Sequence, residues 1–309
     1  MGSEEKQKKP IATMVWVIAL LTAIAFAIAG FFPEITHSGT KSGNVAVIPV
    51  HGVILSNGDS YFDEQATSSS EIVQFIEDAE DDPSIRAMVF DINSPGGSAV
   101  ASQEVADAVQ KSTKPTVAWI RDSGTSGAFW VATAADKVVA NPMSITGSIG
   151  VTASYLQFSG LLQDYNVSYE VLTAGRLKEV GSPFKALTQE ERKLFQEQLD
   201  ELHTYFIQAI AANRNLSEAM VRDYATGMFF LGSKAKELGF VDVLGGKDEV
   251  KQILERQLKT NVTFFTYERE VSLFDILSRV MGKQSFSLGR GIGNGIAETN
   301  RNSKVEVRA

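Results

Sequence analysis

Hydrophobic positions between residues 45 and 258 follow two periods, that of a buried strand and that of an amphipathic helix. The apolar runs predicted as strands lie at 45–50, 85–92, 116–120, 137–140 and 168–173, and helical patterns separate them at about 71–80, 98–110 and 127–135. Strands and helices that alternate at intervals of roughly 30 residues are typical of parallel βαβ units. The pattern therefore predicts an α/β fold with a parallel sheet.

A longer helical pattern follows in the second half of the chain. Thr188 and Glu191 have the spacing of a capping box, and apolar residues then recur at helical spacing to about Asn213. After it come helical patterns at 217–225 and 233–239, a strand at 240–244 and an amphipathic helix at 247–258.

Residues 11–32 form an uncharged apolar run of a different kind. A helix of this length spans about 33 Å, which is enough to cross a bilayer core of about 30 Å. Lysines at 6, 8 and 9 precede it, so we expect a single-pass anchor with a cytoplasmic N-terminus. Ala27-Ile28-Ala29 also fits a signal-peptide cleavage site, and a buried core helix is the third interpretation. Either of the first two places the body of the protein outside the cytoplasm.

These patterns divide the chain into five predicted parts. They are a cytoplasmic segment at 1–10, an anchor at 11–32, a linker at 33–44, a folded domain at 45–258 and an extension at 259–309. The end of the extension, from 283, is rich in Gly, Ser, Asn and charge, which indicates partial disorder.

Composition removes several function classes. The formal net charge is −8, and no nucleic-acid motif is present, so we expect no nucleic-acid partner. The chain has no cysteine, which excludes disulfides, thiolate metal sites and a cysteine nucleophile. We expect neither a metal nor a cofactor.

Two glycine-containing turns carry the candidate chemistry. Asn93-Ser94-Pro95-Gly96-Gly97-Ser98 follows a predicted strand and opens a helix, where free amides can bind a developing oxyanion. Ser126, in Ser123-Gly124-Thr125-Ser126-Gly127-Ala128-Phe129-Trp130, lies at the next such junction, which would expose its hydroxyl. Each turn taken alone also fits an ordinary role, the first as a chain reversal and the second as a helix N-cap.

A reactive serine needs a base, and the three histidines are poorly placed for this role. His37 lies in the linker, His51 on the first strand and His203 inside the long helix. A lysine can serve if an apolar pocket keeps its amine neutral. Lys178 is the candidate, Lys185 is its rival only seven residues later, and a solvated surface charge is the ordinary alternative.

Several segments resemble the signal peptide peptidase A family in sequence and in order. They are NSPGGS, SGTSGA, ITGSIGV, GRLKEVGSPFKALTQEE and GMFFLGSKAKELGFVDVLGG, and the resemblance covers about 45–258. It implies the fold of repeated ββα units that Clp protease and crotonase share. It also implies that Ser126 is the nucleophile and Lys178 the general base. Gly97 and Gly127 would then supply the oxyanion hole, and Ser148 would orient the lysine.

The chain departs from the family pattern at two places. Asp91 stands where a basic residue is frequent, and Ala128, Phe129 and Trp130 replace the usual Gly-Tyr-Tyr after the nucleophile. Both departures would affect the substrate pocket rather than the catalytic atoms. Phe129 and Trp130 fit an aromatic substrate groove and fit core packing equally well.

The resemblance also implies the assembly and the substrate. The chain has one copy of the repeat, so we expect a ring-like homo-oligomer in which Ser126 and Lys178 of one site come from different chains. The expected function is a membrane-anchored serine endopeptidase that degrades cleaved signal peptides and other apolar peptides. The alternatives are a peptidase acting on stomatin-like membrane partners, a non-catalytic membrane scaffold and an acyl-CoA enzyme of the crotonase type.

Overall fold

The predicted apolar runs form the inner strands of one sheet. The structure, a computed structural model, describes residues 43–57 and 66–267, and in these residues nine strands make a single sheet. The strands are β1 (Val45–Leu55), β2 (Ala66–Ser68), β3 (Ala87–Gly97), β4 (Thr116–Thr125), β5 (Lys137–Ala140), β6 (Ile145–Gly147), β7 (Phe229–Leu231), β8 (Val243–Leu244) and β9 (Phe264–Thr266). The helices are α2 (Ser69–Asp81), α3 (Ala99–Lys111), α4 (Gly127–Thr133), α5 (Ser159–Asp164), α6 (Gln189–Arg214), α7 (Glu218–Tyr224), α8 (Gly232–Glu237) and α9 (Lys247–Leu258).

The sheet is parallel except at one pair. Its main order is β2-β1-β3-β4-β5-β8, and only the pairing of β6 with β7 is antiparallel among the described strands. β9 pairs with β1, so the sheet includes residues beyond the expected domain limit at 258. The mixed α/β fold with a parallel sheet is therefore confirmed.

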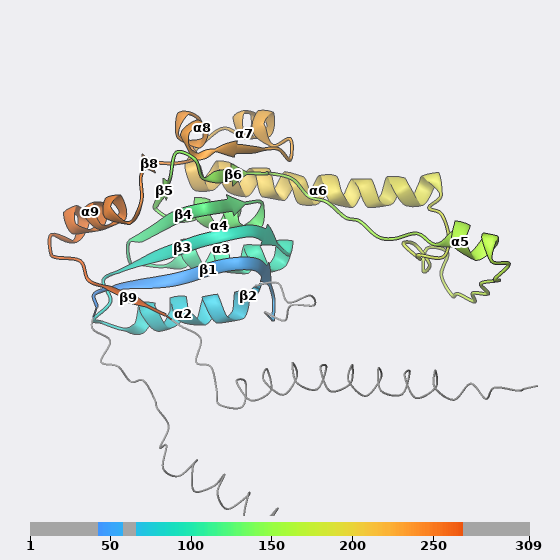
Figure 1. Cartoon of the computed structure of the whole chain (residues 1–309), viewed down its shortest axis with the longest axis horizontal. Helices are drawn as coiled ribbons and strands as arrows, with labels where there is room; N and C mark the ends of the chain where they lie inside the picture. Colours follow the sequence, from blue (N-terminus) through green and yellow to red (C-terminus); the bar gives the residue numbers. More distant parts are fainter. Residues whose placement is uncertain (1–42, 58–65, 268–309) are drawn as a thin grey trace, which may run out of the picture.

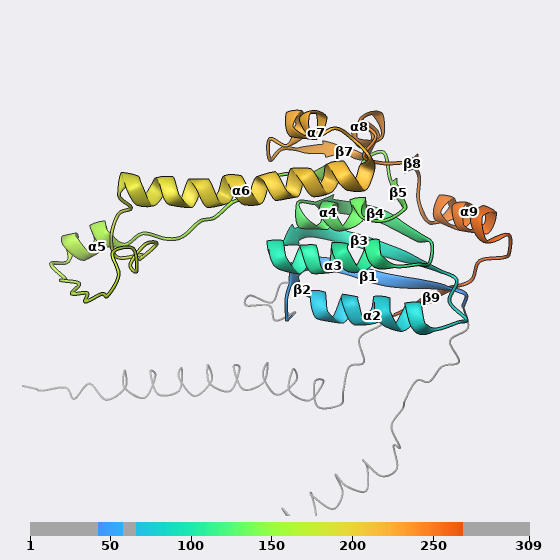
Figure 2. The ribbon, with the colours of Figure 1, turned by 180° about the vertical axis from the view of Figure 1, so that it is seen from behind.

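Helices cover the two faces of the sheet unequally. α2, α3, α4 and α6 lie on one face, as Figures 1 and 2 show from opposite sides, and the larger apolar core lies between them and the strands. On the other face a smaller cluster packs Val250 and Leu254 of α9 against Val45, Val89 and neighbouring valines. The face that carries α3, α4 and α6 is the one that positions the candidate site.

Residues 151–188, here called the arm, leave the body of the protein. Figures 1 and 2 show that the arm starts near β6, runs along α6 and places α5 beyond the far end of that helix, while α3 and α4 lie near the opposite end. None of residues 151–190, all of which the structure describes, is buried. The strand predicted at 168–173 is wrong: these residues form no regular element, and none of the described strands pairs with them.

The N-terminal predictions concern residues outside the described part of the chain. The apolar run at 11–32, the segment before it and the tail from 268 are not described. Within residues 43–57 and 66–267, no helix combines the length and the apolar character that a membrane crossing requires.

Candidate active site

Ser126 occupies a strained turn between β4 and α4. Its φ is 53° and its ψ is −126°, a conformation that residues with a side chain rarely adopt. The turn is held from both sides, because Ser126 N donates to Gly147 O at 2.8 Å and Trp130 N donates to Ser126 O at 3.0 Å. Ser126 does stand at the N-cap position, but within the described chain its hydroxyl makes no capping hydrogen bond. The hydroxyl is therefore available for chemistry.

The glycine turn at the end of β3 packs directly against Ser126. Gly96 has a φ of 100°, and a Cβ on it would lie 2.8 Å from Gly127 N and 2.9 Å from Ser126 Cβ. A Cβ on Gly97 would overlap the backbone of Ile54 in β1. Glycine is thus required at both positions by close backbone approach.

The amides of Gly97 and Gly127 lie beside each other at this contact. The position of a Cβ on Gly127 is 3.4 Å from Gly97 N, and it would overlap the Ser102 hydroxyl. Gly127 is the first residue of α4, so its N–H has no acceptor within its own helix and lies at the positive end of the helix dipole. Two such amides can stabilise a carbonyl oxygen that gains negative charge.

Ser148 lies immediately after the carbonyl that anchors Ser126. It also has a positive φ, 53°, and its Oγ donates to Gly227 O at 3.2 Å. A hydroxyl that donates to a carbonyl keeps its lone pairs free to accept a hydrogen bond from an amine. Four of the five predicted site residues are therefore gathered at the carboxyl ends of β3, β4 and β6.

A cavity of about 920 Å³ opens beside Ser126. Its walls come from α3, α4, α6 and the chain after β6; the residues that line it include Gly97, Ser126, Gly127, Trp130, Val151, Leu199, Leu202, Tyr205 and Phe206. Trp130 stacks on Phe206 with ring centroids 5.2 Å apart, and both residues line the cavity. Phe129 is fully buried against Phe230 and Phe240 and serves the core.

Lys178 does not join this group within one protomer. It is an exposed residue of the arm, and it is not among the residues that line the cavity. Phe206, at the cavity, and Gln189, next to the arm, are 17 residues apart on α6, which corresponds to roughly 26 Å along the helix axis. Within the described part of the chain, the Lys178 side chain has no ion-pair partner.

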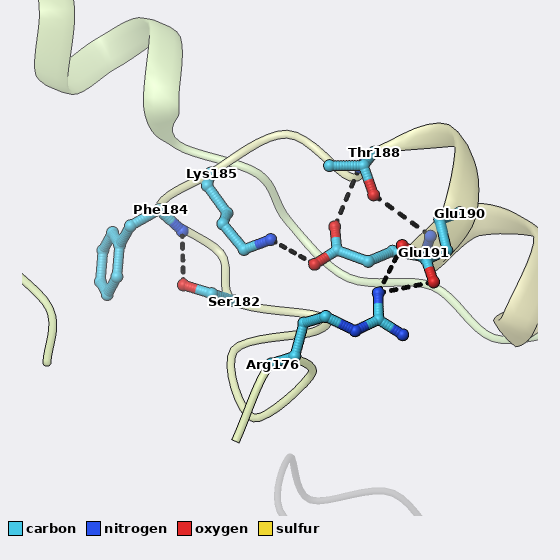
Figure 3. Close-up of polar contacts among 7 residues, drawn as sticks. All are labelled: Arg176, Ser182, Phe184, Lys185, Thr188, Glu190 and Glu191. Atoms are coloured by element: carbon cyan, nitrogen blue, oxygen red, sulfur yellow. Dashed lines mark hydrogen bonds and ion pairs between the residues drawn. The ribbon is translucent and has the colours of Figure 1, made fainter. Parts of the chain in front are cut away.

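The rival base, Lys185, is occupied by a structural contact. Its ammonium group donates to Glu191 Oε1 at 2.6 Å, while Glu191 Oε2 accepts from Thr188 N at 2.9 Å (Figure 3). Glu191 N in turn donates to the Thr188 hydroxyl at 3.2 Å, so the predicted capping box is confirmed. The hydrogen bond from Lys185, followed by that from Thr188, lowers the pKa of Glu191 below its ordinary value of about 4.5.

The histidines of the described chain do not serve Ser126. Neither His51 nor His203 lines the cavity. His51 Nε2 lies 3.5 Å from Asp91 Oδ2, and Arg121 pairs with the same carboxylate at 3.2 Å. Asp91, the departure from the family pattern, thus has a place in an ion-pair group. Among the described residues, no group of three or more His, Asp or Glu side chains could hold a metal ion.

The sequence reasoning missed the residues of α3 and α6 that line the cavity. Gln103, Asp107 and Gln110 share one face of α3, where their polar character resembles that of any solvated helix surface. Leu199 and Leu202 of α6 are spaced like core positions, although both face the cavity. Only the packing of α6 across α4 distinguishes these side chains from surface and core residues.

Comparison with known proteins places the chain in a family. Residues 108–261 match the sequence pattern of peptidase family S49. A putative protease of Methanocaldococcus jannaschii is 31% identical over 79% of this chain and 77% of its own length. A putative signal peptide peptidase SppA of Enterococcus faecium is 28% identical over 78% of this chain and 72% of its own. The chloroplastic serine protease SPPA of Arabidopsis thaliana is 27% identical over 70% of this chain and 33% of its own.

The matched region contains the strained serine turn, Ser148 and the arm. With 31% identity across most of two whole chains, the relationship extends well beyond one motif. The chain belongs to peptidase family S49 and is a serine peptidase of the signal peptide peptidase A family.

Proposed function

We propose that the protein is an endopeptidase in which Ser126 is the nucleophile and Lys178 the general base. The observation that carries the proposal is the strained Ser126 turn, packed against the amides of Gly97 and Gly127 at the mouth of a cavity. A strained backbone persists only where surrounding structure maintains it, and such positions cluster at active sites.

The reaction follows from the roles of these groups. Ser126 Oγ bonds to the peptide carbonyl carbon while its proton passes to the neutral Lys178 amine. The carbonyl oxygen, now negative, accepts hydrogen bonds from Gly97 N and Gly127 N. When the C–N bond breaks, Lys178 returns the proton to the leaving amine. Water then attacks the ester, with Lys178 again accepting the proton, and releases the carboxylic acid and free Ser126. Ser148 Oγ would hold the Lys178 amine in line with Ser126.

We propose that Lys178 reaches Ser126 from a neighbouring protomer. The arm has exposed apolar side chains along most of its length; they include Tyr155, Leu156, Phe158, Leu161, Tyr165, Tyr169, Leu172 and Phe184. Exposed large apolar side chains in such number are typical of a protein interface. Packing the arm on a second copy would cover these side chains and remove Lys178 from water, which a neutral amine requires. A ring of such contacts is the proposed assembly.

The proposed substrates are extended apolar peptides, among them signal peptides left in the membrane after cleavage. The cavity walls contributed by Trp130, Leu202 and Phe206 suit apolar side chains. The uncharged run at 11–32 would hold the enzyme at the membrane with its catalytic domain outside the cytoplasm. A relative of comparable length from Enterococcus faecium is named a putative signal peptide peptidase.

Hydrolysis of an unstructured apolar peptide by the whole protein tests the proposal. We expect Ser126→Ala to reduce kcat by at least about a thousandfold, and Lys178→Ala to cause a similar loss. Lys185→Arg, which keeps a cation beside Glu191 but removes a possible amine base, is the matched control and should retain most activity. An active Lys178→Ala, with Lys185→Arg inactive, would assign the base to Lys185. An inactive wild type would favour the scaffold interpretation.

A further inference from the structure

The cavity beside Ser126 continues as a groove between α3 and α6. Gly97 and Ser126 lie at one end, and Gln110 of α3 and Asn213 of α6 both line the other. Gln110 Nε2 donates to Asn213 Oδ1 at 3.3 Å, so this hydrogen bond joins the two helices across the groove. The groove therefore starts at the proposed nucleophile and ends at a polar bridge.

A single charge marks the bridged end. Asp107 is the only charged side chain among the described residues that line the groove, and it lies one turn before Gln110 on the same face of α3. In the described part of the chain, no cation pairs with its carboxylate. Removing water from an unpaired carboxylate is unfavourable, so a ligand that fills the groove must supply a cation or leave Asp107 hydrated.

The walls of the groove suit an aliphatic chain with a cationic tip. Ala106 and Ala209 leave space between the helices, and Trp130 and Tyr205 present aromatic rings. Lysine and arginine bury their methylene stems against such surfaces while the charged end reaches a carboxylate or a ring face. A peptide with an uncharged side chain at this position would leave the carboxylate without a partner.

The helix geometry sets the distance from the cleaved bond. Asp107 is eight residues beyond Ala99, where α3 begins beside Gly97, which corresponds to about 12 Å along the axis. An extended peptide advances about 3.3 Å per residue. We propose that Asp107 selects substrates with a lysine or arginine three to four residues from the cleaved bond. This inference rests on the proposed endopeptidase function and adds a subsite to it.

Paired peptides measure this selection. Within each pair the two peptides are identical except that one has lysine where the other has norleucine, which keeps the aliphatic stem but not the charge. From pair to pair, this residue is placed at one to six residues from the cleaved bond. We expect wild type to show kcat/KM about fivefold higher for the lysine peptide at the third or fourth position only. The preference should weaken as salt is added, because the contact is electrostatic.

Asp107→Asn and Glu77→Gln each remove one negative charge, so comparing them separates the effect of the subsite from that of the protein's net charge. Asp107→Asn should bring the lysine-to-norleucine ratio to about one, and Asp107→Lys should favour a glutamate peptide instead. Glu77→Gln removes one negative charge from an exposed position of α2, outside the groove, and should keep the wild-type ratio. An unchanged ratio in Asp107→Asn, or an equal loss in Glu77→Gln, would overturn the inference.

Binding to the Ser126→Ala protein supplies a readout that does not need turnover. Fluorescent lysine and norleucine peptides should differ in Kd by the same factor, and Asp107→Asn, combined with Ser126→Ala, should remove the difference. If no peptide is hydrolysed by wild type but the Kd ratio depends on Asp107, the endopeptidase proposal fails and the subsite stands. If hydrolysis depends on Ser126 but neither the kcat/KM ratio nor the Kd ratio changes in Asp107→Asn, the subsite inference is wrong and the endopeptidase proposal is unaffected.

Discussion

At the scale of single residues, the site depends on positions where a side chain would not fit or where the backbone is strained. Ser126 keeps a φ of 53° because Gly147 O and the first turn of α4 hold its backbone on both sides. Gly97 and Gly127 bring two amides into one place because neither has a Cβ. The chemistry of the serine therefore depends on glycines that contribute no side chain.

We predict that substituting Gly97 lowers both the stability and the activity of the protein. A Cβ on Gly97 would overlap the Ile54 backbone, which cannot move without displacing β1, so Gly97→Ala should destabilise the fold by about 1–3 kcal/mol. Displacing one oxyanion donor should also reduce kcat by at least about 100-fold. Thermal unfolding and peptide hydrolysis measure the two effects.

Gly160 offers the matched control. It lies in α5, and a Cβ on it would meet no atom within 4 Å. Gly160→Ala should leave stability and hydrolysis near wild type, since alanine favours a helix. A Gly97→Ala protein with wild-type activity would show that the Gly97 amide does not serve the oxyanion.

At the scale of elements, α6 connects the body of the protein to the arm. Its second half packs on α4 through Phe206 and lines the groove, while its first half carries the capping box beside the arm. Thr188, Lys185 and Glu191 fix the chain where the arm enters α6 (Figure 3). The orientation of the arm, and hence the place of Lys178, depends on this junction.

We predict that the stability of the first turn of α6 depends on pH. Because the pKa of Glu191 is lowered in the folded state, its carboxylate form stabilises the helix start. This contribution is complete above the ordinary value of about 4.5 and is lost as pH falls below it through the lower folded pKa. The amides of Thr188, Glu191 and Arg192 donate within this junction, and their exchange, corrected for intrinsic rates, should show weaker protection at pH 4 than at pH 7.

Two glutamine variants test the assignment. Glu191→Gln should remove most of the pH-dependent part of the protection, whereas Glu201→Gln, at an exposed position of the same helix, should keep it. If the Glu191→Gln protein retains the full pH dependence, another group controls the start of α6.

At the scale of the whole molecule, one protomer contains all the proposed catalytic groups but does not bring them together. Ser126, Gly97, Gly127 and Ser148 lie on the body, and Lys178 lies on an arm with an exposed apolar surface. Figures 1 and 2 show the arm extending away from the sheet in both views. A second copy would complete the site and cover the arm at the same time.

Complementation between two inactive variants is the prediction at this scale. Mixed oligomers of Ser126→Ala and Lys178→Ala protomers contain sites in which an intact Ser126 faces an intact Lys178. Random equal mixing should restore about a quarter of wild-type activity if neighbours share each site. Mixed oligomers without activity would place both groups of the dyad on one chain, and a fully active monomer would contradict the proposed ring.

Much of the fold follows from local pattern. Alternating apolar runs predicted β1, β3, β4 and β5 together with the helices between them, because the period of buried residues is a property of the chain itself. The capping box at Thr188 was predictable for the same reason, since its partners are three residues apart. Motif order placed the chain in its family and singled out Ser126 as the candidate nucleophile.

The tertiary structure decided what depends on partners distant in sequence. β6, β7 and β9 are three-residue strands that exist because a neighbouring strand pairs with each of them, whereas no described strand pairs with residues 168–173. Asp107 lines a groove only because α6 crosses α4. The separation of Lys178 from Ser126 likewise arises from the direction in which the arm leaves the body, and local sequence pattern does not encode that direction.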